Sequence, residues 1–488
     1  MLLGYDLGSS SVKASLVDSV TKKVIAIASY PEREMPILSS KEGWAEQHPE
    51  EWWQNVKKVT SILFEKAGID KTLVTAIGIS YQMHGLVAID KKGEVVRPSI
   101  IWCDSRAVAL GEKAFKEMGK DKCLDNLLNS PGNFTASKLK WVQENEPELY
   151  KKIDKIMLPG DYINFRLTGE INTTNTGLSE GIFWDFRKDQ LSDMLMDYFG
   201  FSKDLIPEVV PVFSKQGTVK AEVATELGFS KDVVVAYRAG DQPNNAFSMN
   251  VLEPGEIAAT AGTSGVVYGV VDEMRFDPES RVNSFAHINH NQDQKRIGVL
   301  LCVNGTGSAY SWLRNNLAPD KSYFDLEKIA SEVEIGSEGL SFLPFGNGAE
   351  RMLGNRIIGA QYQHIQFNRH TFSHMVRACL EGIAFSIVYG INCMKELGLS
   401  PKTIKAGNDN MFQSAIFSET IATLTGSEIQ LKETTGAVGA ALGAGYGAGE
   451  YNSLAETFSE EHIEKTYQEN ESKRAQYTEA YDKWLTYL

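Results

Sequence analysis

The sequence predicts a two-domain α/β protein built from two related halves, and three observations support this. The chain has 488 residues, more than one ordinary hydrophobic core accommodates. Its β-rich start, LLGYDLGSSSVKASLV, is echoed by EIAATAGTSGVVYGVV at residues 256–271. Each copy is a β run, a turn of Gly with Ser or Thr, and a second β run. Because helical segments follow each start, we expect two α/β halves facing one another.

The first half alternates short β runs with helices. A helix is expected from about residue 49 to 67, with Pro49 in its first turn. Residues 134–170 are expected to be helical. The remaining predicted elements are three β runs at the N-terminus, a strand at TAIGIS, a hairpin at LVAIDKKGEVVR, a strand running into a helix at IIWCDSRA, and the strand VVVAYRAG, which ends at GDQPNN.

The second half closes with a helical series. Residues 371–398 carry an apolar stripe at helical spacing, with Gly398 as a plausible stop. TIKAGND predicts a strand followed by a helix, and TGAVGAALGAGYGAG a small-residue helix that can pack closely on another backbone. Residues after 451 are expected to form a surface helix. The predicted domains are therefore 1–245, 246–450, and a helical tail, 451–488, packed on the second domain.

Composition narrows the functional class. The net charge of −14 disfavours a nucleic-acid surface, which needs a basic patch. Five scattered cysteines without a CxxC pair fit a reducing cytoplasm better than a disulfide framework or zinc site. Asp6 interrupts the N-terminal apolar run, so no signal peptide is expected. The longest uncharged stretch, residues 257–271, is too short to span a bilayer, so no membrane association is expected.

Three glycine turns follow apolar β runs: DLGSSS at 6–11, AGTSG at 261–265 and AGND at 406–409. Each alone is more often a plain turn than a phosphate loop. Together, with one at the head of each half, they indicate a nucleotide held between two domains. The first two would contact phosphates through backbone N–H and hydroxyl groups. The third would lie near the adenosine.

Polar residues at strand ends are the other candidates. Asp241 follows a valine-rich β run, where open α/β sheets place their ligands. A helix N-cap is the competing interpretation, and the motif alone favours it. In SYQMHGLV, Met83 and His84 are either core residues or an apolar wall with a polar tip for a small polyol. Asp104 and Arg106 occupy a similar position, where an ordinary surface ion pair is the alternative.

The ordered motifs DLGSSSVKA, GWAEQHP, QMHG, IIWCDSRA, FTASKLKWVQEN, GDQPNNA, ATAGTSG, LEGIAFS and TGAVGAALGAG resemble the FGGY carbohydrate kinases over residues 1 to about 450. The resemblance implies the actin, Hsp70 and hexokinase ATPase fold, with duplicated ribonuclease H-like domains and an active site in the interdomain cleft. Within the family, QMHG resembles the xylulokinases, whereas glycerol kinases carry an Arg–Glu pair there. Asn408 and Asp409 add polar bulk where the family's adenosine loop is usually GGGARS.

The resemblance also implies roles for particular residues. Asp241 matches the base that accepts the proton of the attacking hydroxyl. Asp6 matches the acid that acts through Mg²⁺ and its waters. The residues implied at the sugar are Met83, His84, Asp104, Asp241 and Gln242. Those implied at ATP are Gly8, Ser9, Ser10, Lys13, Gly262, Thr263, Gly307, Gly407 and Met411.

The sequence thus predicts a cytoplasmic kinase that uses ATP and Mg²⁺ to phosphorylate the terminal hydroxyl of D-xylulose, and it leaves a homodimer open. The alternatives are a kinase for another ketose or polyol, such as ribulose, fuculose or glycerol, and a non-sugar ATPase of the same superfamily. Asp241 together with QMHG argues against the ATPase, which needs no sugar pocket.

Overall fold

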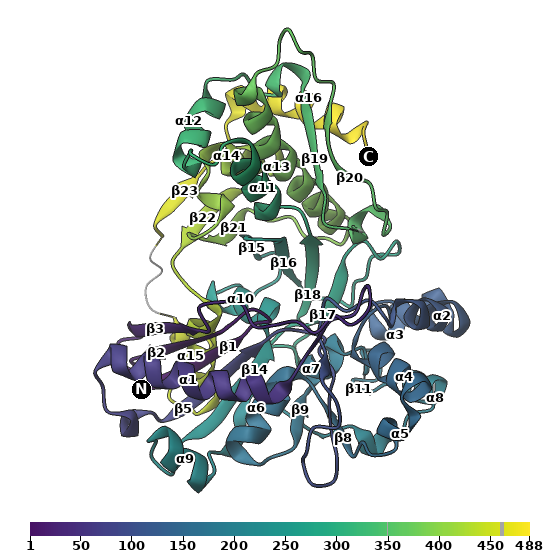
Figure 1. The fold of residues 1–488 in the computed structure, drawn as a ribbon, viewed down its shortest axis with the longest axis vertical. Coiled ribbons are helices and arrows are strands. Elements are labelled where there is room, and N and C mark those ends of the chain that lie inside the picture. The colour runs from purple at the N-terminus through teal and green to yellow at the C-terminus, as the bar shows by residue number, and fades with distance from the viewer. Residues whose placement is uncertain (349, 459–462) are drawn as a thin grey trace. The chain divides into compact units, whose positions relative to one another are not determined.

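The computed structural model describes residues 1–348, 350–458 and 463–488. The chain forms two compact units (Figure 1). The first unit joins residues 1–250, 285–296 and the described part of 434–461. The second unit joins residues 251–284, 297–433 and the C-terminal segment from 463 onward. These units run differently from the expected domain ranges, because residues 436–447 pack on the N-terminal strands.

A six-stranded sheet forms the centre of the first unit. Its β1 and β2 make an antiparallel hairpin, and β1, β5 and β14 are parallel neighbours. Across the sheet the strands run in the order β13 (Phe213–Thr218), β14 (Val234–Gly240), β5 (Ala76–Tyr81), β1 (Leu2–Leu7), β2 (Val12–Val17) and β3 (Val24–Tyr30).

The second unit repeats this topology. Here β15 and β16 make the antiparallel hairpin, and β15, β21 and β22 are the parallel neighbours. The order across this sheet is β17 (Asn283–Ala286), β18 (Ile297–Val303), β16 (Gly265–Val271), β15 (Ile257–Ala261), β21 (Thr403–Gly407), β22 (Glu428–Lys432) and β23 (Lys465–Tyr467). The expectation of two related α/β halves is confirmed.

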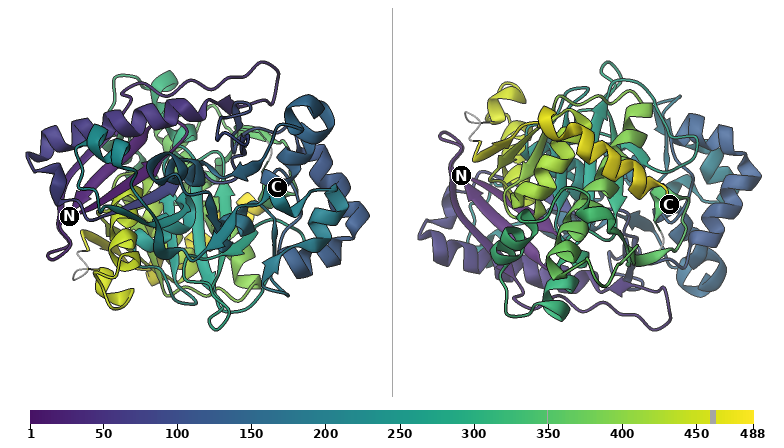
Figure 2. Two further views of the ribbon diagram at one scale, coloured as in Figure 1. Left: turned by 90° about the horizontal axis from the view of Figure 1, so that it is seen from below. Right: turned by 90° about the horizontal axis from the view of Figure 1, so that it is seen from above.

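Two helices cover the faces of the first sheet. One face packs against α1 (Pro49–Ala67), which buries Trp52, Val56 and Leu63, and Figure 2 shows this purple helix along the purple strands. The other face packs against α15 (Gly436–Gly447). That contact is backbone on backbone: a Cβ on Gly4 would meet the Ala437 carbonyl oxygen at 1.9 Å. Glycine in the strand and small residues in the helix therefore permit this close packing.

The other elements complete each unit. The remaining helices of the first unit are α2 (Val108–Met118), α3 (Lys120–Leu127), α4 (Thr135–Asn145), α5 (Pro147–Tyr150), α6 (Pro159–Thr168), α7 (Asn175–Glu180), α8 (Asp193–Phe199), α9 (Ala221–Leu227) and α10 (Asp241–Ser248). Its small strand pairs are β4 (Glu46–Gln47) with β7 (Ser99–Ile100), β6 (Val87–Ile89) with β8 (Lys155–Met157), β12 (Glu208–Val210) with β9 (Asn172–Thr174), and β10 (Trp184–Asp185) with β11 (Gln190–Leu191). The second unit adds β19 (Ser341–Phe345) paired with β20 (Gly359–Gln363), and the helices α11 (Gly307–Leu317), α12 (Tyr323–Ser331), α13 (Phe372–Glu396), α14 (Ala415–Thr425) and α16 (Arg474–Leu485).

Three local predictions were wrong. Residues 134–170 are not helical throughout, because β8 interrupts them to pair with β6. IIWCDSRA is not a strand running into a helix, because it contains only the end of the two-residue strand β7. The expected hairpin after β6 is present, with Ile89 bridged to Val95 and backbone hydrogen bonds from Asp90 to Glu94 and from Val96 to Ala88. The C-terminal segment is not simply a surface helix: β23 joins the sheet, and α16 buries Tyr477, Tyr481 and Trp484. Figure 2 shows α16, in yellow, against the green helices of this unit.

One helix of the second unit has the length and composition of a membrane span. Among the described residues α13 alone passes this test, and 89% of its apolar window is buried inside the fold. Its apolar stripe packs on β19 and α14, so it is a core helix of this unit. Gly398, two residues beyond its end, has a φ of +88°, the left-handed conformation expected at such a stop.

Candidate active site

Three parallel neighbours of the first sheet end at the same edge and deliver the acidic candidates together. Asp6 lies near the end of β1, opposite Ser80 of β5, whose hydroxyl donates a 2.8 Å hydrogen bond to Asp6 Oδ1. Asp241 directly follows β14, and Met83 and His84 lie two and three residues beyond the end of β5. The side chain of Met83 fills the space beside Gly240, where an added Cβ would meet Met83 Cγ at 2.7 Å. The carboxyl edge of this sheet is the ligand edge expected for open α/β sheets.

The N-cap interpretation of Asp241 does not fit the geometry. Asp241 is the first residue of α10, and Gly240 occupies the N-cap position without a side-chain cap bond. Loss of hydration and, second to it, the negative charge of Asp6 together raise the pKa of Asp241 to about 7, against hydrogen bonds from Gln242 that lower it. Desolvation also raises the pKa of Asp6, against the Ser80 hydrogen bond and the charge of Lys13.

Two desolvated carboxylates, of which Asp6 raises the pKa of Asp241 by its charge, are suited to a cation. The Asp6 carboxylate also lies against Gly436 and Asn245: a Cβ on Gly436 would meet Asp6 Oδ2 at 2.6 Å and Asn245 Oδ1 at 3.0 Å. Carboxylate and amide oxygens are the hard ligands that Mg²⁺ prefers, usually with several of its waters retained. The residues present therefore fit a hydrated Mg²⁺. Among the described residues no cluster of three or more His, Cys, Asp or Glu forms a direct metal cage.

His84 is held in an unusual conformation. Its φ is +62°, in the left-handed region, and its Nδ1 lies 2.9 Å from the carbonyl oxygen of Glu180. The ring packs edge-on to Phe134 at 4.8 Å between centroids. The buried ammonium of Lys138 donates hydrogen bonds of 2.9 Å to the carbonyls of His84 and Ile101. Burial lowers the pKa of Lys138 to about 7. Lys138 thus ties the QMHG loop to the IIWCD loop.

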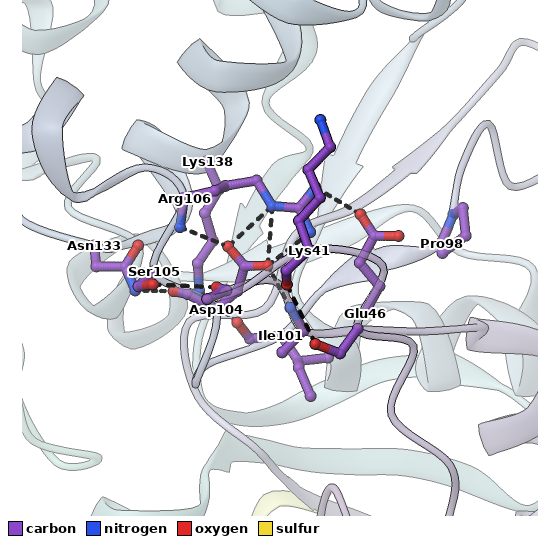
Figure 3. Close-up of polar contacts among 12 residues, drawn as sticks. Lys41, Glu46, Pro98, Ile101, Asp104, Ser105, Arg106, Asn133 and Lys138 are labelled. Atoms are coloured by element: carbon purple, nitrogen blue, oxygen red, sulfur yellow. Dashed lines mark hydrogen bonds and ion pairs between the residues drawn. The ribbon is translucent and has the colours of Figure 1, made fainter. Parts of the chain in front are cut away.

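Asp104 and Arg106 are not a surface ion pair. Both side chains are almost fully buried. Arg106 donates hydrogen bonds from Nε and Nη2 to Asp104 Oδ2, the Nη2 bond being 2.6 Å long (Figure 3). The Ala45 N–H donates a further 2.6 Å bond to Asp104 Oδ2. Glu46 pairs with Arg106 at 2.6 Å on its other side. Both Asp104 oxygens already accept hydrogen bonds within the fold, so Asp104 fixes this loop, while its expected contact with the sugar stays a prediction.

The first glycine turn is anchored through its backbone. Gly8 N–H bonds to the Ser11 carbonyl at 3.0 Å, and the Gln47 side chain donates to the Ser9 carbonyl at 2.7 Å. The half-exposed Trp102 lies 3.3 Å from Ser9 Oγ through its Nε1. Ser10 is exposed, and Lys13 points to solvent from β2. The turn is therefore held in place through its backbone, while the serine hydroxyls that are expected to contact phosphate remain accessible.

The second unit holds the other glycine turns. The Gly307 N–H bonds to the Gly262 carbonyl at 2.9 Å, and the Ser308 N–H bonds to the Thr263 carbonyl at 3.1 Å. Gly262, Thr263, Gly307 and Met411 all line a cavity of about 780 Å³, together with aromatic residues of α11 and α12. Of the predicted nucleotide residues in this unit, Gly407 lies outside that lining, at the end of β21.

Sequence reasoning missed several buried residues of the first unit. Glu180 is 2% exposed, and burial together with the charges of Asp241 and Asp161 raises its pKa far above the usual range. Asp161 pairs with Arg238 of β14 at 3.0 Å. Glu180 sits in the apolar run LSEGIFW, where a lone acid is a weak signal. Lys138, Asn245 and Trp102 lie inside the motifs FTASKLKWVQEN, GDQPNNA and IIWCDSRA, but the sequence analysis assigned them no role.

Comparison with known proteins assigns the family. The description "FGGY family of carbohydrate kinases, N-terminal domain" matches residues 1–248, and the corresponding C-terminal domain matches residues 257–448. The chain belongs to the FGGY family of carbohydrate kinases. This FGGY kinase is 30% identical to "Xylulose kinase" of Bacillus subtilis (strain 168) over 473 residues, 93% of this chain and 90% of that protein.

Solved structures support the fold. The xylulose kinase structure from Rhodospirillum rubrum superposes with a TM-score of 0.89 at 26% identity, covering 100% of this chain and 98% of that one. A glycerol kinase from Plasmodium falciparum, solved with ADP, superposes with a TM-score of 0.87 at 20% identity, covering 99% of this chain and 97% of that one. The second likeness concerns the fold alone. This FGGY kinase therefore has the actin-like ATPase fold, and its family implies a small-molecule sugar and ATP as substrates.

Proposed function

We propose that this FGGY kinase transfers the γ-phosphoryl group of ATP to the terminal hydroxyl of D-xylulose, giving D-xylulose 5-phosphate and ADP. One observation carries the proposal: Met83 and His84 of QMHG follow β5 directly beside β14, which ends at Asp241. QMHG is the feature by which the sequence resembles xylulokinases. The name of the Bacillus subtilis relative supports the same substrate.

In the proposed reaction Asp241 is the general base. The sugar oxygen attacks the γ-phosphorus, its proton passes to the Asp241 carboxylate, and the bond to the ADP oxygen breaks. A pKa near 7 suits this task, since a base poised close to the working pH is deprotonated yet able to hold the proton. The rest of the work is alignment and charge neutralisation.

Asp6 would hold Mg²⁺ through water, with Asn245 beside it. The ion would supply charge neutralisation for the ATP phosphates. Gly8, Ser9, Ser10 and Lys13 would meet phosphate in the first unit. In the second unit the cavity lined by Gly262, Thr263, Gly307 and Met411 would take the rest of ATP, with Gly407 near its edge.

Met83 and His84, which we call the substrate pair, would recognise the sugar by its shape and by hydrogen bonding. The Met83 side chain offers an adaptable apolar surface for sugar C–H groups. His84 Nε2 can exchange a hydrogen bond with a sugar hydroxyl, because Nδ1 is already engaged with Glu180. Gln242 would steady the Asp241 carboxylate through its hydrogen bonds. Asp104 would act indirectly, by fixing the loop that Lys138 also holds.

The decisive experiment is a sugar panel with ATP and Mg²⁺, read by ADP release. We expect D-xylulose to give the highest kcat/KM among D-xylulose, D-ribulose, L-ribulose, L-xylulose, L-fuculose and glycerol. A clear preference for another member would overturn the xylulose assignment. ADP release that does not depend on any sugar would favour the non-sugar ATPase instead.

His84→Asn tests the substrate pair. Asparagine tolerates the left-handed φ of +62°, so the backbone should persist while the imidazole contact is lost. One lost polar contact is expected to raise the KM for D-xylulose roughly tenfold, with basal ATP hydrolysis unchanged. His364→Asn is the matched control, because His364 has a φ of +65° on an exposed turn. Equal KM values in wild type and His84→Asn would remove His84 from the sugar site.

Asp6→Asn tests the metal assignment. Its negative charge helps raise the pKa of Asp241, so its removal should shift the acidic limb of the kcat/KM profile to lower pH. The variant should also need more Mg²⁺ for half-maximal rate. Glu32→Gln, an exposed charge change on the same unit, should do neither. If Asp6→Asn changed only the KM for the sugar, Asp6 would belong to the sugar and not to the metal.

A further inference from the structure

A second cavity lies in the first unit, apart from every residue discussed so far as catalytic or substrate-binding. We call it the β12 cavity, since Val209 and Val210 of β12 form part of its wall. Its volume is about 480 Å³, within the range of small-molecule sites. None of the proposed sugar or ATP residues lines it.

The polar lining is dominated by side-chain amides. Asparagine and glutamine each offer donors and acceptors without charge, and five of them belong to the lining: Asn175, Asn289, Asn291, Gln292 and Gln294. The amides of Asn175 and Asn291 already bond to backbone groups and shape the wall. Such a set complements hydroxyl groups, which both donate and accept. The lining therefore suits a ligand that carries several hydroxyls.

Trp184 gives an independent indication of a missing partner. The residue lines the cavity and is 8% exposed. Within the described part of the chain its Nε1 has no hydrogen-bond acceptor. A buried N–H without an acceptor is unfavourable, and tryptophan usually finds one. An acceptor oxygen of a bound molecule would satisfy it, and the indole ring can pack on sugar C–H groups.

The charge of the cavity argues for a neutral ligand. Among the described lining residues there is no lysine or arginine, and Asp189 contributes a carboxylate. His290 lies 3.8 Å from that carboxylate and receives a hydrogen bond from the Arg296 N–H on Nδ1. Burial lowers the pKa of His290, as does the charge of Lys295, so no histidine cation forms at neutral pH. A phosphate would meet the Asp189 charge without a counter-charge on the wall.

The rest of the lining of the β12 cavity is apolar. Phe213 and Tyr446 pack edge to face, with centroids 5.1 Å apart, and Val209 and Leu454 lie on the same lining. Aromatic and aliphatic walls with a few polar groups are the usual composition of small-molecule sites. We propose that the β12 cavity binds a neutral polyhydroxylated molecule, a monosaccharide or polyol, at a site separate from the phosphorylation chemistry.

The test uses the full chain and saturation-transfer NMR with D-glucose, D-xylose and xylitol as probes. We expect at least one to bind the wild type. Val209→Trp should abolish this binding by filling the cavity mouth, since Val209 is 43% exposed and the larger ring needs no core space. Val24→Trp is the matched control: Val24 is a 44% exposed strand valine of the same unit and should bind as the wild type does.

Two further measurements separate this site from the active site. Trp184→Phe keeps the aromatic face but loses the N–H, so affinity should fall by up to about tenfold. Sugar-dependent ADP release by Val209→Trp should match the wild type. Binding of none of the three probes, binding that survives Val209→Trp, equal loss in Val24→Trp, or tighter binding of D-glucose 6-phosphate than of D-glucose would each overturn the proposal.

Discussion

Asp241→Asn is expected to lower kcat for sugar phosphorylation by about 10²–10⁴-fold, the usual cost of removing a general base. The amide fits the same space at the start of α10 but cannot accept the hydroxyl proton. ATP binding should persist, because the nucleotide cavity of the second unit does not include Asp241. Single-turnover ADP release and equilibrium ATP binding measure the two effects separately.

Thermal stability provides a second measurement for Asp241, and here the substitution is expected to have a favourable effect where its effect on activity is unfavourable. Its pKa lies well above the usual value, so the folded protein retains this proton over a pH range in which the unfolded chain has released it. Stability from this group therefore falls as pH rises from about 4 to about 7, and the penalty is complete above that window. Asp241→Asn removes the charge and should raise the unfolding temperature at pH 8.

Asp193→Asn is the matched control, since Asp193 is also the first residue of a short helix, α8. It should leave kcat and its pH dependence unchanged. A rate for Asp241→Asn within a few-fold of wild type would return Asp241 to a purely structural role. A lower unfolding temperature for that variant would contradict the desolvated carboxylate.

Lys138→Met is expected to damage both stability and sugar use. Methionine matches the apolar stem but has no donors, so the carbonyls of His84 and Ile101 lose their 2.9 Å partners. The Ile101 carbonyl still accepts a hydrogen bond from the Asp104 N–H, so the variant loses two hydrogen bonds, each worth about 0.5–3 kcal/mol, or about 1–6 kcal/mol for the two together. With both loops released, KM for the sugar should rise more than kcat falls. Denaturant unfolding and steady-state kinetics provide the measurements.

Lys140→Met controls for the loss of a lysine from the same helix, because Lys140 is only partly buried and contacts Gln143 and Glu144. Its stability should change little, as expected for a partly exposed pair. If Lys138→Met matched Lys140→Met in both stability and KM, the loops would be held by other contacts. If stability fell while KM stayed constant, Lys138 would not position the sugar residues.

The regular parts of the fold were readable from the sequence because their signals are local. Period-two and period-3.6 patterns predicted β1, β2, β14, α1 and α13, and the echo at 256–271 predicted the repeated sheet. These local patterns did not predict strands whose pairing partners are distant in the sequence. Neither the strand β8 nor the strand β23 carries a strong local signal, and each exists through its partner, β6 or β22.

The residues of the candidate site also fall into those with a local sequence signal and those without one. Asp6, His84 and Asp241 could be chosen as candidates because each lies at or just beyond the end of a recognisable β run, and their roles stay predictions. The burial of Asp104 could not be predicted, because a two-residue spacing to Arg106 looks the same whether the pair is exposed or buried, and only the fold supplies Ala45, Glu46 and Asn133 around it. Lys138 and Glu180 act through contacts with residues 54 and 96 positions away, a separation that no local pattern encodes.

The order of synthesis matters for the small-residue helix α15. Its carbonyls at Ala437 and Ala440 rest on Gly4 and Gly78, so a wall of the N-terminal core is supplied by residues made long after the strands that they cover. A nascent chain that has emerged only as far as residue 250 has its β1, β5 and β14 sequences but not the helix that covers them. The apolar face of this sheet therefore stays exposed to chaperones and to other ribosome-bound chains until α15 has emerged from the ribosome.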